Sequence, residues 1–179
     1  PHNPALVTDW RRFSSDTAVA YIRMQAEILQ EATPNTPVTT TFRPYGTQID
    51  SFDLADAIDF VSLDGEPTSE AQASTAAMNL DMARSLKKDD EAEGFWVMEQ
   101  KAGQVSYGEA NSLIRPGVAR LFTYQMVARG ATGILYFYWR QPRIGPEKFY
   151  GGVLTHDGRG DNRLYTEMLE LGEEMGHLA

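Results

Sequence analysis

The run Phe95-Trp96-Val97-Met98-Glu99 decides the fold of this chain, because it joins a fully apolar stretch directly to a carboxylate. Consecutive apolar residues without polar alternation are typical of a strand buried on both faces, as in a parallel sheet that is covered by helices. In such folds the functional side chains follow the carboxyl ends of the strands. The sequence therefore predicts a buried strand that presents Glu99 at the working edge of a sheet.

Three further stretches have the composition of strands. They are rich in β-branched or apolar residues and are bounded by turn residues, and they cover residues 38–42, 60–63 and 133–139. Apolar residues at helical spacing predict helices over residues 9–31, 73–83, 115–130 and 161–176, and a short one between 47 and 58. In the first of these helices Val19, Ile22, Ala26 and Leu29 share one face, and in the third Leu121, Phe122 and Met126 are expected to point inward.

Strands that alternate with helices predict a parallel sheet, and hence the α/β class. Strand starts separated by about 20 to 38 residues fit four consecutive βα units of a TIM barrel. A complete (β/α)8 barrel needs roughly 250 residues, so a chain of 179 residues fits half of one. A self-contained doubly wound sheet is the alternative, but it predicts a glycine-rich or lysine-containing phosphate loop, and the sequence has neither.

Composition excludes several classes of partner. The net charge of −9 and the pI of about 4.8 argue against nucleic acid and against an anionic membrane. The absence of cysteine excludes disulfides and thiolate metal sites, and no apolar run approaches the roughly 20 residues of a membrane span. Nothing requires an oxidising compartment, so a cytoplasmic location is favoured. The chain opens without an initiator methionine, and we expect it to be a fragment.

The residues that follow the four strands are the candidates for chemistry: Arg43, Asp64 with Glu66, Glu99 and Arg140. A carboxylate at a barrel mouth among aromatic neighbours suits attack on a sugar carbon, although a Glu in a loop can instead cap a helix or form an ion pair. Arg140 can line the site or pair with an acidic residue, and position alone favours neither role.

The run Trp96-Val97-Met98-Glu99-Gln100, followed by Gly103-Gln104-Val105, resembles the nucleophile strand of glycoside hydrolase family 42 β-galactosidases. Other family motifs follow in order: the run Pro4 to Phe13, Asp59-Phe60-Val61-Ser62, Arg115-Pro116-Gly117, Leu135-Tyr136-Phe137, Trp139-Arg140-Gln141 and His156-Asp157-Gly158. The resemblance covers nearly the whole chain. It implies that residues 1–179 form the C-terminal half of the catalytic barrel, about strands five to eight with their helices.

The resemblance implies a retaining mechanism in which Glu99 is the nucleophile. The family's acid/base Glu follows an Asn at the end of the fourth strand, which precedes the first helix of this chain, so that residue is missing from this segment. Two carboxylates supply the chemistry, and we expect no metal or organic cofactor. The structural zinc that some members bind through cysteines cannot lie in this segment.

Other family positions imply substrate contacts. Glu147 matches a Glu that binds galactose hydroxyls, Tyr150 stands where the family has His, and Tyr107 stands where it has a Trp platform. Phe137, Asp64 and Arg140 complete the expected substrate-binding residues. Where the family reads Trp-Asp-Asn-Tyr-Pro, this chain reads Leu63-Asp64-Gly65-Glu66-Pro67, and a carboxylate at Glu66 would raise the pKa of a neighbouring nucleophile.

Two functions of different classes remain open. The first is a retaining glycosidase for β-galactosides or related carbohydrates, which is inactive as this segment alone and is completed by the N-terminal half of its barrel. The family type predicts a homo-oligomer for the full-length protein. The second is a non-catalytic carbohydrate-binding or self-associating half-barrel, because one carboxylate cannot run a two-step displacement and two sheet edges would stay open.

Overall fold

The computed structural model describes residues 3–43, 48–65, 67, 72–87, 94–104 and 113–178. Its centre is a parallel sheet of four strands that lie in chain order: β1 (Thr41–Phe42), β2 (Val61–Leu63), β3 (Phe95–Lys101) and β4 (Ala131–Phe137). Parallel strands in sequential order are the arrangement of consecutive βα units. The predicted α/β class and all four predicted strands are therefore confirmed, with β1 shorter than the sequence suggested. The expectation that Glu99 follows the third strand is wrong, because β3 keeps its pairing with β4 as far as Lys101 and so contains Glu99.

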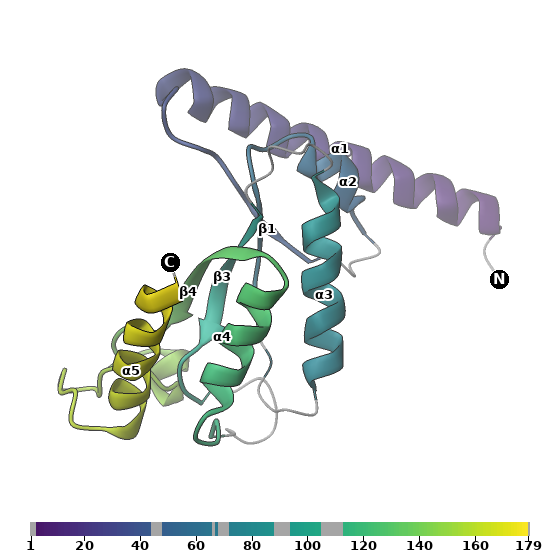
Figure 1. The fold of residues 1–179 in the computed structure, drawn as a ribbon. Helices are drawn as coiled ribbons and strands as arrows, with labels where there is room; N and C mark the ends of the chain where they lie inside the picture. The colour runs from purple at the N-terminus through teal and green to yellow at the C-terminus, as the bar shows by residue number, and fades with distance from the viewer. Residues whose placement is uncertain are drawn as a thin grey trace.

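The described helices are α1 (Pro4–Ala32), α2 (Ser51–Ala55), α3 (Ala73–Leu86), α4 (Val118–Ala128) and α5 (Arg163–Leu178), with a short 3₁₀ helix, η2 (Pro146–Phe149). The long helix α1 begins after Asn3, whose side chain accepts a hydrogen bond from the amide of Ala5, and Pro4 occupies its first turn. Figure 1 shows α4 between α3 and α5 on one side of the sheet, with α1 running across one end of the molecule.

The hydrophobic core lies between the sheet and the helices α3 and α4. Val97 of β3, Leu80 of α3 and Phe122 of α4 are almost fully buried within it. The opposite face of the sheet carries Trp96 and Leu135, whose side chains are 40% and 41% exposed. The expectation that the strand at residues 95–98 is buried on both faces is therefore wrong, because the described helices pack against one face only.

Two apolar residues that were expected to point inward are half exposed. Leu29 of α1 and Leu121 of α4 are each 49% exposed, whereas their neighbours Ala26 and Phe122 are buried. Each helix presents an apolar stripe that is wider than the surface it covers, so the residues at the edge of the stripe remain in solvent. No helix in the described part of the chain is both long and apolar enough to cross a membrane.

Candidate active site

Strand β3 carries Glu99 in a local irregularity of its pairing with β4. Val97 pairs with Ile134, but the next pair joins Gln100 to Tyr136, so β3 has one residue more than β4 between these positions. Val97 and Gln100 are buried on the helix side, and Glu99 is partly buried within the bulge between them. A β-bulge re-aims side chains and is common beside active sites, and here it interrupts the regular alternation of side chains between Val97 and Gln100.

The chain beyond β4 places a second carboxylate beside aromatic side chains. The hydroxyl of Tyr138 donates a hydrogen bond to Oε2 of Glu147, which lies in the 3₁₀ helix η2. The ring of Tyr138 lies 3.4 Å from that of Phe137 and 6.5 Å from that of Tyr150, measured between centroids. Three of the expected substrate-binding residues, Phe137, Glu147 and Tyr150, are therefore gathered around Tyr138.

The segment that carries Glu147 and Tyr150 is a loop whose two ends are joined by backbone hydrogen bonds. The amide of Val153 donates to the carbonyl of Tyr138 at 2.9 Å, and the amide of Leu154 donates to that of Trp139 at 2.8 Å. Because both ends are held where β4 terminates, residues 142–152 project as one closed loop from the carboxyl edge of the sheet.

The same loop touches the chain just beyond Glu99. The amide of Gly151 donates to the carbonyl of Gln104 at 2.7 Å. A Cβ added to Gly103 would lie only 2.8 Å from Cα of Gly151, so the two backbones approach more closely than any side chain permits. This contact sets the position of the Glu147 loop relative to strand β3.

Electrostatic coupling links both acidic residues to one hydroxyl. Burial raises the pKa of Tyr138 above the ordinary value, and Glu147, through its hydrogen bond and its charge, and then the charge of Glu99 raise it further. Both carboxylates therefore act on the same phenol, which remains protonated at neutral pH. The arrangement provides two negative charges and a neutral donor next to aromatic faces, a combination that suits binding of a polyhydroxylated, uncharged ligand.

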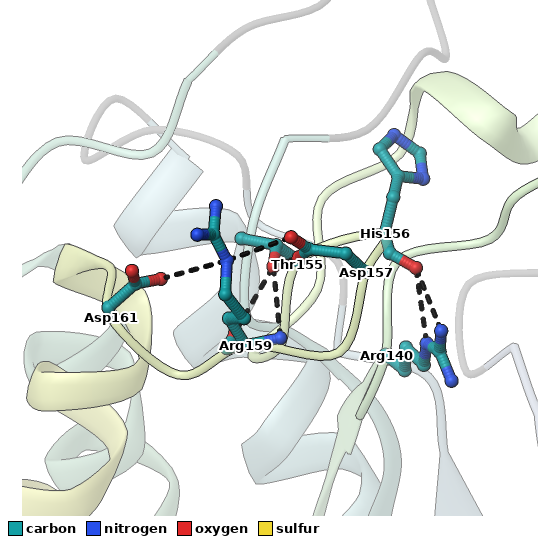
Figure 2. A network of polar contacts seen from close by, with 6 residues as sticks. All are labelled: Arg140, Thr155, His156, Asp157, Arg159 and Asp161. Carbon is teal, nitrogen blue, oxygen red and sulfur yellow. Dashed lines mark hydrogen bonds and ion pairs between the residues drawn. The ribbon is translucent and has the colours of Figure 1, made fainter.

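Arg140 holds a loop instead of pairing with an acidic side chain. Its guanidinium donates to the carbonyl oxygen of His156 from Nη2 at 2.9 Å and from Nε at 3.3 Å. Figure 2 shows this contact beside a second cluster, in which Arg159 lies between Asp157 and Asp161, and the ring of His156 points away from both. The guanidinium of Arg140 thus holds the loop of residues 155–161 through the His156 carbonyl. The expected role of Arg140 in substrate binding stays a prediction.

Asp64 lies at a different part of the sheet edge. It borders a groove of about 630 Å³ between the ends of β1 and β2 and helix α3, together with Phe42 and Arg43. Among the residues described there, neither Glu99 nor Glu147 lines this groove. Tyr107 and Glu66, which the sequence also singled out, lie outside the described residues.

Tyr138 is the site residue that the sequence analysis missed. The apolar pattern predicts a strand over residues 133–139 that includes it, whereas β4 ends at Phe137. A signal was present, because Tyr138 is the only residue with a hydroxyl among 137–139, next to the predicted strand end. Where a strand terminates decides which side chain reaches the edge, and that boundary is the least certain part of a sequence-based assignment.

Comparison with known proteins gives a family match over nearly the whole chain. The family model of glycoside hydrolase family 42, described as "Beta-galactosidase", matches residues 1–178. The β-galactosidase bgaB of Geobacillus kaustophilus is 38% identical over 177 residues, which cover 98% of this chain and 26% of that protein. The β-galactosidase LacZ of Heyndrickxia coagulans is 36% identical, again over 98% of this chain and 26% of its own length.

Solved structures agree with the sequence matches. The crystal structure of a β-galactosidase from Bacillus circulans sp. alkalophilus superimposes with a TM-score of 0.87 at 36% identity, covering 96% of this chain and 25% of that one. A β-galactosidase from Halorubrum lacusprofundi gives a TM-score of 0.87 at 29% identity, over 98% and 28% of the two chains. The chain thus spans about a quarter of the length of these relatives, and the predicted partial barrel is confirmed.

Proposed function

Because the chain belongs to glycoside hydrolase family 42, we propose that residues 1–179 are the C-terminal half of the catalytic barrel of a retaining β-galactosidase. The observation that carries this proposal is geometric: Glu99 lies near the carboxyl end of β3, and the loop that bears Glu147 is hydrogen bonded to the chain just beyond it, from Gly151 to Gln104. The carboxyl edge of the sheet is where (β/α)8 enzymes keep their catalytic groups.

In the proposed reaction Glu99 is the nucleophile. Its carboxylate attacks the anomeric carbon and forms a glycosyl ester, while the glycosidic C–O bond breaks and the leaving oxygen takes a proton from the acid/base Glu. Water then attacks the same carbon, the acid/base residue accepts its proton, and Glu99 is released. The family pattern places the acid/base Glu before this chain, so the preceding half of the barrel supplies it.

The remaining residues are proposed to bind the sugar. Glu147 accepts hydrogen bonds from sugar hydroxyls, and the rings of Phe137 and Tyr150 provide apolar surface beside it. Asp64, Tyr107 and Arg140 are proposed to contact more distant parts of the substrate. The net charge of −9 disfavours nucleic acid and favours a neutral carbohydrate.

The alternative function is a carbohydrate-binding or self-associating half-barrel without turnover. The observation in its favour is that Trp96 and Leu135, on the face of the sheet opposite α3 and α4, remain about 40% exposed. In this alternative two copies of the chain cover that face and pair the strands at its edges. We refer to this chain joined to the preceding half, in its own full-length polypeptide or grafted into the Geobacillus kaustophilus relative, as the completed barrel.

The proposal is tested by intact-mass measurement of the chain and of the completed barrel after incubation with a 2-deoxy-2-fluoro-β-galactoside that has a good leaving group. Such a reagent needs little help from an acid, so it reports the nucleophile even when the partner Glu is absent. We expect one added fluorosugar in the completed barrel and none in its Glu99→Gln variant. Label that persists after Glu99→Gln, or a completed barrel that stays unlabelled, rejects Glu99 as the nucleophile.

A further inference from the structure

Tyr138 is held at three levels of its structure. Its carbonyl accepts a hydrogen bond from the amide of Val153 at 2.9 Å, and its ring contacts that of Phe137 and lies 6.5 Å from that of Tyr150 between centroids. Its hydroxyl then donates to Oε2 of Glu147. A side chain that is held at its backbone, ring and hydroxyl has little conformational freedom, so it can fix the orientation of the carboxylate that it contacts.

The side chain of Glu147 depends on such a contact for its orientation. It lies in a four-residue 3₁₀ helix on an exposed part of the loop, and a Glu side chain loses considerable rotamer entropy when it is ordered. A phenol that donates to one carboxylate oxygen forms a charge-assisted hydrogen bond, roughly twice as strong as a neutral one. That bond fixes the plane of the carboxylate before any ligand binds and leaves the second oxygen, Oε1, turned away from the donor.

We propose that Tyr138 is a positioning residue of the sugar site, whose hydroxyl holds Oε2 of Glu147 so that Oε1 meets a hydroxyl of the sugar bound at Glu99. This inference rests on the proposed function and adds the residue that prepares its binding carboxylate. Burial together with the charges of Glu147 and Glu99 raises the pKa of Tyr138. The phenol consequently keeps the proton that the contact requires through neutral and mildly alkaline pH.

The consequence is measurable as a difference between binding and chemistry. Tyr138 touches neither the anomeric carbon nor the leaving group in this scheme, so its removal weakens ground state and transition state alike. Such a loss raises KM and leaves kcat nearly unchanged. Pre-ordering of one charged contact by one charge-assisted hydrogen bond corresponds to about a tenfold change.

The test is a double-substitution cycle in the completed barrel, with hydrolysis of a nitrophenyl β-galactoside as the readout. Tyr138→Phe keeps the ring that contacts Phe137, so the fold is retained, and it removes only the hydroxyl. We expect KM to rise about tenfold with kcat changed less than about threefold. In the Glu147→Ala background the same substitution should change kcat/KM by less than about twofold, because the acceptor through which Tyr138 acts is no longer there.

Tyr136→Phe is the matched control. Tyr136 lies in β4, two residues before Tyr138, and its hydroxyl is also hydrogen bonded, to Thr123 of α4 on the helix side of the sheet. Thermal unfolding should respond to both substitutions, but KM should respond only to Tyr138→Phe. An equal rise in KM for Tyr136→Phe, or an equal effect of Tyr138→Phe with and without Glu147, overturns the positioning role.

The outcome separates this inference from the proposed function. Fluorosugar labelling of Glu99 is measured on the same proteins, and its absence in the parent completed barrel rejects the proposed function itself. A parent that is labelled, together with a Tyr138→Phe variant whose KM is unchanged, rejects the role of Tyr138 alone.

Discussion

Replacing Gly103 by Ala tests whether the contact between the chain beyond Glu99 and the Glu147 loop sets the geometry of the site. A Cβ at Gly103 would lie 2.8 Å from Cα and 3.0 Å from the carbonyl carbon of Gly151. Gly103 is not among the glycines with positive φ, so Ala can adopt its backbone conformation. The perturbation is therefore steric, and it acts on backbone atoms that cannot rotate away.

The size of the effect follows from these distances. An ordinary contact begins at 3.4 Å, so the two backbones must separate by about 0.6 Å to accept the new methyl group. Overpacking of this kind costs about 1 to 3 kcal/mol of folding free energy. A misplacement of about 1 Å costs roughly a hundredfold in rate, so a shift of half that size is expected to lower kcat/KM about tenfold.

The assay is galactoside hydrolysis by the completed barrel, with thermal unfolding of the same samples. Gly172→Ala is the matched control, because a Cβ at this position of α5 meets nothing within 4 Å, and Ala in a helix stabilises by about 0.5 to 1 kcal/mol. Full activity of Gly103→Ala, with a stability equal to that of the parent, would refute the reasoning. Reduced stability with unchanged kcat/KM would show that the contact supports the fold but not the site.

Three further predictions concern the packing around the site. Phe122→Ala removes a ring that is 1% exposed and should cost about 3 to 5 kcal/mol in urea unfolding, against less than about 1 kcal/mol for the half-exposed Leu121→Ala. The hydrogen bond from Arg120 lowers the pKa of the Glu174 carboxyl below its ordinary value, so the ion pair stabilises the contact between α4 and α5 above the ordinary pKa and is lost as the pH falls through the lower, folded-state pKa. Glu174→Gln should therefore make the free energy of unfolding less dependent on pH in the acid range, and an unchanged pH dependence contradicts this. Arg140→Lys should speed amide exchange in residues 155–161, because an ammonium cannot make both contacts to one carbonyl; exchange as slow as in the parent would show that the loop holds itself.

Much of the fold was accessible from local pattern. The continuous apolar run before Glu99 indicated a strand of a helix-covered parallel sheet, and helical spacing located the long helices between strands. The pattern failed where burial depends on what lies opposite. Trp96 is as apolar as Val97, yet it is half exposed because it faces the side of the sheet that the described helices leave uncovered.

The sequence nominates residues for the candidate site but not the contacts that join them. The apolar run predicts Glu99 directly after a strand, whereas it lies inside β3. Glu147 and Tyr150 follow from the family resemblance. The sequence does not predict the hydrogen bond from Tyr138 to Glu147, because this bond depends on where β4 ends and on the path of the loop that brings Glu147, nine residues later, back to Tyr138. The sequence allows Arg140 either to line the site or to pair with an acidic residue. Its contact with the His156 carbonyl depends on the position of a backbone atom, which residue spacing does not predict.

The sequence by itself determined the period of each element and the residue types at the strand ends, because these depend on neighbours within a few positions along the chain. The tertiary structure decided the rest. Three features depend on segments that are distant in sequence or out of register. They are the bulge that contains Glu99, the close approach of Gly103 to Gly151, and the hydrogen bond from Tyr138 to Glu147. Such contacts exist only after packing has set the distances between backbones, which no local pattern along the chain specifies.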